Sequence, residues 1–114
     1  MLLAAACTAP SAQQPAPAPA ATAPRYSPVG LEAVIGRTAR FLETQFGHPD
    51  LDIREGTARK LQFAGPVCVL DAYLYPPKGG GEPIVSYVDA RLPDGRDIDR
   101  ASCVAALQQR QKAR

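Results

Sequence analysis

Residues 67–75 read Val-Cys-Val-Leu-Asp-Ala-Tyr-Leu-Tyr, and a pair of prolines follows them. Successive side chains of a β-strand point to opposite faces, so this run has one apolar face and one mixed face. The apolar face consists of Cys68, Leu70, Ala72 and Leu74. The mixed face consists of Val69, Asp71, Tyr73 and Tyr75. We expect helices to cover the apolar face, while water reaches the mixed face and solvates Asp71.

Two further segments alternate in the same way and predict neighbouring strands. Residues 59–64 precede the central strand, and a Gly-Pro turn separates the two. Residues 84–91 follow it after a loop at 78–83 that contains three consecutive glycines. Short connections of this kind join antiparallel strands. The sequence therefore predicts a three-stranded antiparallel sheet.

Apolar residues at helical spacing predict three helices. The first spans residues 28–35. The second begins after Thr38, a residue suited to cap a helix, and ends at Gly47, which a proline follows two residues later. The third spans residues 102–112 and carries Cys103. The predicted fold is thus α+β, with two N-terminal helices and a C-terminal helix packed on one face of the three-stranded sheet.

The chain divides by composition into three parts. Its 114 residues allow one small domain, which we place at residues 30–112. Residues 8–29 are dominated by alanine and proline, a composition that forms no apolar core and favours an extended, semi-rigid linker. Residues 1–7 read Met-Leu-Leu-Ala-Ala-Ala-Cys, and they resemble the end of a lipoprotein signal peptide, where small residues precede the lipid-bearing cysteine.

Cys7 is therefore the candidate residue for lipid attachment. The six residues before it contain no basic side chain and are too few for a secretory signal peptide. We accordingly interpret the start as truncated and expect the true translation start to lie upstream. The alternative is an ordinary apolar start with an incidental cysteine.

An odd number of cysteines in an exported protein leaves one thiol to explain. If Cys7 carries a lipid, Cys68 and Cys103 remain, and an oxidising compartment favours a disulfide between them. Such a bond would hold the last helix near the Cys68 end of the apolar face. The alternative is a pair of buried, unpaired thiols.

Several other kinds of function find little support in the sequence. Basic and acidic residues are interleaved and the net charge is +2, which argues against nucleic acid as the main partner. No apolar run is long enough for a membrane-spanning helix. A degenerate hydrolase built around the single histidine, His48, would need a deep pocket there. The cysteines lack zinc-site spacing, so we expect no enzyme activity, cofactor, metal or small-molecule substrate.

The mixed face of the central strand is the candidate interaction surface. The next strand adds two side chains if the hairpin is in register. The candidate partner-binding residues are then Val69, Tyr73, Tyr75, Val85 and Tyr87. Tyrosine provides contact area and a hydroxyl group at a low cost in conformational entropy. The alternative is that these residues pack across strands and only stabilise the sheet.

The segment from Gly36 to Pro49 begins Gly-Arg-Thr, continues to Leu42 and closes with Phe-Gly-His-Pro. It resembles the helix-to-turn signature of the BamE (SmpA/OmlA) lipoproteins. The resemblance implies an outer-membrane lipoprotein with two helices on a three-stranded sheet, which supports the assembly of β-barrel proteins as a scaffold. No partner-binding residue is carried over from that family.

Together these observations predict a lipid-anchored, non-catalytic scaffold or accessory factor on the periplasmic face of the outer membrane. Its expected partners are the membrane, through the lipid, and proteins of the cell envelope. The alternative function is that of a small periplasmic inhibitor or ligand-binding module with the same α+β fold.

Overall fold

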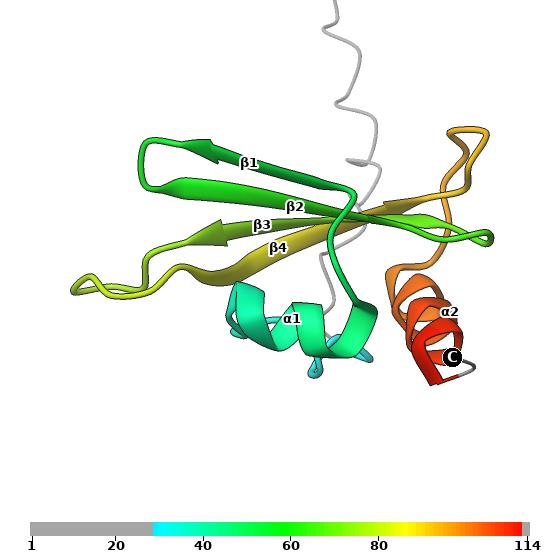
Figure 1. The fold of residues 1–114 in the computed structure, drawn as a ribbon, viewed down its shortest axis with the longest axis horizontal. Helices are drawn as coiled ribbons and strands as arrows, with labels where there is room; N and C mark the ends of the chain where they lie inside the picture. The colour runs from blue at the N-terminus through cyan, green and yellow to red at the C-terminus, as the bar shows by residue number, and fades with distance from the viewer. Residues whose placement is uncertain (1–28, 113–114) are drawn as a thin grey trace, which may run out of the picture.

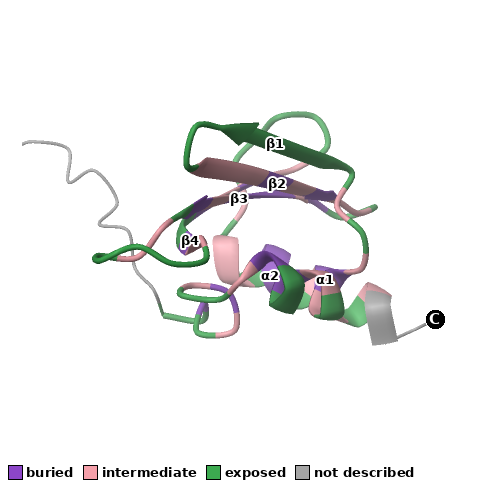
Figure 2. Cartoon of the chain, turned by 60° about the vertical axis from the view of Figure 1, so that its left-hand side comes forward, coloured by how far each residue is buried: buried purple, intermediate pink, exposed green. Residues whose placement is uncertain are grey.

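The computed structural model describes residues 29–112, with side chains to residue 110. Four antiparallel strands form one sheet in the order β1-β2-β3-β4, and both helices lie on the same face of it (Figure 1). The elements in chain order are α1 Ala39–Phe46, β1 Leu51–Glu55, β2 Ala58–Ala64, β3 Val69–Tyr75, β4 Ile84–Arg91 and α2 Arg100–Lys112. The buried apolar residues lie between the helices and the sheet, whereas β1 is exposed along its whole length (Figure 2).

The predicted arrangement of two N-terminal helices and a C-terminal helix on a three-stranded sheet is wrong. The sheet has a fourth strand, β1, and within the described residues only one helix precedes it. β1 pairs with β2 across the two-residue loop Gly56-Thr57, with Glu55 opposite Ala58. Gly56 has a φ of 58°, a left-handed conformation that suits the first position of a type II′ hairpin turn.

The helix predicted over residues 28–35 is also absent from its described part, which forms turns. Gly30 and Gly36 both have a φ of 80°, which a right-handed α-helix does not accommodate. The N–H of Gly36 donates to the carbonyl of Val85, so the segment ends against β4 instead of continuing as a helix. Leu31 and Val34 nevertheless lie in the core, because the turns direct them toward the sheet.

α1 begins and ends where the sequence predicts. The Oγ1 atom of Thr38 accepts a hydrogen bond from the N–H of Phe41 at 3.2 Å, which caps the first turn. Gly47, with a φ of 85°, ends the helix. The ring of Phe46 packs edge-on against Phe63 of β2, with ring centroids 5.2 Å apart. This contact fixes α1 against the sheet.

α2 begins two residues earlier than predicted because Asp99 caps it. The Asp99 carboxylate accepts hydrogen bonds from the N–H and the hydroxyl of Ser102, each at 2.9 Å. These bonds lower the pKa of Asp99, and the bond from the backbone N–H is the larger cause. Neither of the helices described here is long and apolar enough to cross a membrane.

The predicted disulfide is confirmed. The Sγ atoms of Cys68 and Cys103 are 2.06 Å apart, and both residues are buried. The bond ties α2 to the residue that precedes β3. The apolar face of the central strand is therefore buried under the helices, as the sequence predicts, and its other members are Leu70, Ala72 and Leu74.

Reduction of this disulfide is expected to destabilise the domain. The two cysteines are 35 residues apart, and closing a loop of that length contributes roughly 3–4 kcal/mol by the chain-entropy estimate. Urea unfolding with and without reductant should show a loss of that size in the free energy of unfolding. The matched control is the variant Cys68→Ser/Cys103→Ser, which should not respond to reductant. If reductant left the urea midpoint of unfolding of the native protein unchanged, this stabilising role of the disulfide would be contradicted.

Candidate functional site

The sheet face opposite the helices carries a row of side chains that crosses all four strands. The register places Ile53 of β1 opposite Lys60 of β2. Lys60 is in turn opposite Tyr73 of β3, and Tyr73 is opposite Tyr87 of β4. We call these four residues the cross-strand row, and the face that bears them the open face.

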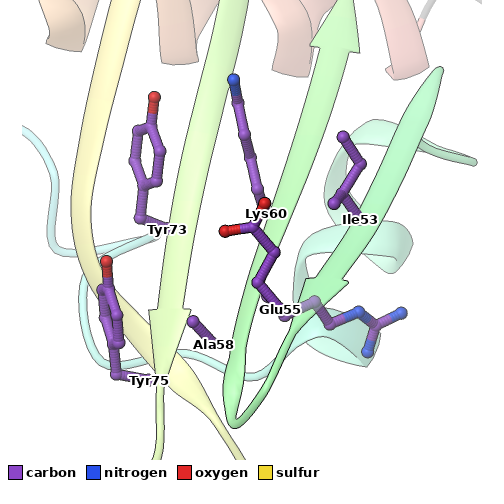
Figure 3. A pocket seen from close by; sticks show the side chains of 7 residues that line it. Ile53, Glu55, Ala58, Lys60, Tyr73 and Tyr75 are labelled. Atoms are coloured by element: carbon purple, nitrogen blue, oxygen red, sulfur yellow. The ribbon is translucent and has the colours of Figure 1, made fainter.

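A hollow of about 300 Å³ lies on the open face beside this row (Figure 3). Its lining residues are Ile53, Glu55, Ala58, Arg59, Lys60, Tyr73 and Tyr75. The two tyrosine rings stand on one side and Ile53 on the other, with the side chains of Lys60 and Glu55 between them (Figure 3). The hollow thus combines apolar walls with charged groups of both signs.

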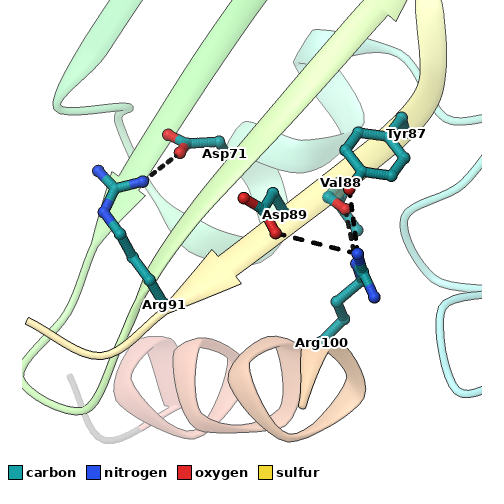
Figure 4. A network of polar contacts seen from close by, with 6 residues as sticks. All are labelled: Asp71, Tyr87, Val88, Asp89, Arg91 and Arg100. Carbon is teal, nitrogen blue, oxygen red and sulfur yellow. Dashed lines mark hydrogen bonds and ion pairs between the residues drawn. The ribbon is translucent and has the colours of Figure 1, made fainter. Parts of the chain in front are cut away.

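Cationic side chains hold the two central tyrosines in place. The rings of Tyr73 and Tyr87 pack with centroids 5.8 Å apart. Lys60 Nζ lies 5.5 Å from the centre of the Tyr73 ring, and the guanidinium carbon of Arg100 lies 5.5 Å from the centre of the Tyr87 ring. Arg100 also donates a hydrogen bond to the Tyr87 hydroxyl at 3.0 Å (Figure 4). Because these contacts already order the tyrosine side chains, binding a partner costs less conformational entropy.

Asp71, which the alternation along the strand predicts to be solvated, is instead buried, with an exposed fraction of 2%. Its carboxylate accepts a hydrogen bond from Gln62 Nε2 at 2.8 Å. It accepts a second one from Arg91 Nη1 at 2.5 Å (Figure 4). Both partners come from the flanking strands, so a pattern along one strand does not reveal them. The bonds compensate the carboxylate for the loss of water.

Four of the five candidate partner-binding residues lie on the open face. Tyr75 and Tyr87 are exposed, with fractions of 46% and 38%. Val69 and Tyr73 are half-buried between neighbouring strands. Of these four residues, the accessible ones are therefore Tyr75 and Tyr87.

Val85 is the exception, because it is buried on the helix-covered face with an exposed fraction of 1%. The pairing of β3 with β4 is irregular, since Tyr73 is opposite Tyr87 whereas Leu74 is opposite Val85. Ser86 is thus an extra residue in β4, and a β-bulge of this kind interrupts the alternation of faces. A regular strand would have placed Val85 and Tyr87 together, which is why the prediction failed.

Three further residues of this face were not predicted from the sequence, namely Leu51, Ile53 and Lys60. Two of them belong to β1, the strand that was not predicted. A signal was present, because Leu51 and Ile53 alternate with charged residues immediately before a Gly-Thr loop. Lys60 lies in a predicted strand, but its contact with Tyr73 depends on the register between strands.

The opposite face of the β1–β2 hairpin carries an ion pair. Arg59 Nε and Nη2 donate to the two carboxylate oxygens of Asp52 at 2.9 and 2.7 Å. The hydrogen bonds lower the pKa of Asp52 and raise the pKa of Arg59. The pair therefore stabilises the fold above the ordinary pKa of an aspartate, and its contribution is lost as the pH falls through the lowered value. A second hollow of about 420 Å³ lies between this hairpin and the β3–β4 loop.

The remaining sequence candidates lie elsewhere. His48 is exposed in the turn after α1 and lines neither hollow. Between residues 29 and 112, no group of three His, Cys, Asp or Glu side chains could hold a metal ion. Cys7 and the proline-rich segment up to residue 28 lie outside the described residues.

Comparisons of the chain with protein-family models, with curated proteins and with solved structures found no match. The open face must therefore be interpreted from its own chemistry.

Proposed function

We propose that this chain is a lipid-anchored lipoprotein on the periplasmic face of the outer membrane, and that it acts there as a non-catalytic scaffold or accessory factor. Cys7, preceded by small residues, would carry the lipid. The proline-rich linker would hold the domain away from the bilayer. The Cys68–Cys103 disulfide supports export, because such bonds persist in oxidising compartments.

The observation that carries the scaffold proposal is the cross-strand row on the open face. Tyrosines held in place by cations on a surface free of helices resemble the anchors of protein interfaces. The neighbouring hollow offers a depression for a side chain of the partner. A protein with apolar groups flanked by charges of both signs would complement this surface.

The likeness of Gly36–Pro49 to the BamE lipoprotein signature supports the same proposal. That segment includes α1 with its threonine cap and its glycine end. It points to a component of the β-barrel assembly machinery as the partner. The four-stranded sheet departs from the family's arrangement, so the proposal relies on the segment and on the open face.

The hollow favours a second candidate function, that of a small periplasmic inhibitor or ligand-binding module. Its volume of about 300 Å³ is at the lower end of the range for small-molecule sites, roughly 300–1,000 Å³. In that case the domain would bind a soluble enzyme or a small ligand instead of an assembly factor.

Lipid anchoring predicts that the chain, expressed behind a lipoprotein signal peptide, fractionates with outer membranes. The variant Cys7→Ser should move to the soluble periplasmic fraction, because the domain alone has no other proposed attachment. The matched control is Cys68→Ser/Cys103→Ser, which retains Cys7 and should remain with the membranes. Recovery of Cys7→Ser with the membranes would count against anchoring.

Partner binding at the open face is tested by photo-crosslinking in intact cells. A crosslinking residue at Tyr75 or Tyr87 should capture a defined envelope protein. The matched control is Phe41 of α1, which is 39% exposed, close to the 38% of Tyr87, but belongs to the helix layer. Capture of a barrel-assembly component would support the scaffold, and capture of a soluble enzyme would support the inhibitor. Equal capture from Phe41 would contradict a role for the open face.

A further inference from the structure

β1 forms one edge of the sheet, and this edge differs from the opposite one. All of its residues are exposed, and β2 is its only partner strand in the described part of the chain. At the opposite edge, the N–H of Gly36 donates to the carbonyl of Val85, and the N–H of Val85 donates to the carbonyl of Arg37. Figures 1 and 2 both show β1 at the rim of the sheet, with no helix or strand beyond it.

The two-residue hairpin determines which backbone groups of β1 face outward. In such a hairpin the residues that flank the loop, here Glu55 and Ala58, exchange both of their hydrogen bonds. Along an antiparallel ladder, hydrogen-bonded pairs alternate with non-hydrogen-bonded pairs. Ile53, two residues before Glu55, therefore also forms its backbone hydrogen bonds with β2. The N–H and C=O groups of Asp52 and Arg54 therefore point away from the sheet, toward any strand that approaches this edge.

We propose that β1 pairs in antiparallel fashion with β1 of a second copy of this chain, about a two-fold axis at Ile53. In this register Asp52 of each copy is opposite Arg54 of the other, so the two residues with outward backbone groups form bonded pairs of opposite charge. A slip of two residues would place either Asp52 opposite Asp52 or Arg54 opposite Arg54. Both arrangements are repulsive, so the charges select one register.

Arg54 is available for this contact, and the carboxylate of Asp52, although already paired with Arg59, has lone pairs for a second cation. The side chain of Arg54 takes part in none of the ion pairs formed within residues 29–112. Asp52 is bonded to Arg59, which favours its ionised form. Arg54 of the second copy would approach the same carboxylate from the other side and place this anion between two cations.

Apolar side chains on the open face support the same pairing. Ile53 is 40% exposed and Leu51 is 38% exposed. On the axis, the two Ile53 residues would face each other as a non-hydrogen-bonded pair, in which side chains lie closest. Pairing would remove this apolar surface from water and join the cross-strand rows of the two copies end to end on one continuous sheet.

A second copy fits this edge better than an unrelated strand does. A foreign strand would need a cation opposite Asp52 and an anion opposite Arg54 at matching positions, whereas the same segment of this chain provides both. The pairing depends neither on lipid attachment nor on an envelope partner. If the pairing fails, the proposed function therefore still stands, and if the proposed function fails, the pairing still stands.

Cysteine crosslinking tests the register. The full chain carries Cys7→Ser, so an introduced cysteine is the only free thiol beside the Cys68–Cys103 disulfide. Ile53→Cys should give a disulfide-linked dimer under mild oxidation, because Cα atoms in such a pair are about 4.5 Å apart. Leu51→Cys and Glu55→Cys should each remain uncrosslinked alone. Their mixture should crosslink, because residue 51 of one copy is opposite residue 55 of the other.

Charge exchange tests the same pairing without a new thiol. Arg54→Glu alone and Asp52→Lys alone each place like charges across the axis. Sedimentation should show association about tenfold weaker or more for either variant, and restored association for their equimolar mixture. Circular dichroism would verify that both variants remain folded.

Three outcomes would overturn the proposal. The first is a native chain that stays monomeric at all concentrations and an Ile53→Cys variant that fails to crosslink. The second is equal crosslinking of the three cysteine variants alone, which would indicate contact without register. The third is exclusive crosslinking of Ile53→Cys to a different protein in cell extract, which would assign the edge to a foreign strand.

Discussion

The structure depends on the burial of one face of β3 beneath α1 and α2. A domain of this size obtains little net stability from its core alone, because a large part of its surface remains in water. The Cys68–Cys103 disulfide compensates by restricting the unfolded chain and by holding α2 beside the central strand. Gln108 of α2 also donates a hydrogen bond to Gln45 of α1 at 2.8 Å, so the two helices form one layer.

Both helices lie on one face of the sheet, so in the described part of the chain no helix covers the open face. The open face contains a carboxylate, Asp71, that is shielded by side chains of the neighbouring strands. Farther along the same strand, Tyr73 and Tyr75 remain accessible or partly accessible. The polar network therefore completes the sheet at one end, whereas the tyrosine end is available for contact with another molecule. The proposed scaffold function uses the tyrosine end of the open face, whereas the proposed pairing uses the exposed edge strand β1.

Features that depend on neighbouring residues in the sequence were predictable. Thr38 and Gly47 mark the ends of α1 because capping and left-handed glycine conformations act within one turn of a helix. The alternation along β3 correctly separates its buried face from its open face. The disulfide followed from counting cysteines in a chain interpreted as exported.

Features that depend on pairing between strands were not predictable in the same way. The short strand β1 is exposed on every residue, so no buried face produces a strong pattern. The bulge at Ser86 reverses the face of Val85, and no residue in the local sequence requires it. Burial of Asp71 depends on Arg91, which is adjacent only after β3 and β4 have paired.

Hydroxyl-radical footprinting of the purified, oxidised protein tests most directly the claim that one face is closed and the other open. We expect Tyr75 and Tyr87 to be modified many times faster than Phe46 and Phe63, which lie between the helices and the sheet. Modification of Phe46 and Phe63 at the same rate as the two tyrosines would contradict the claim of one closed and one open face.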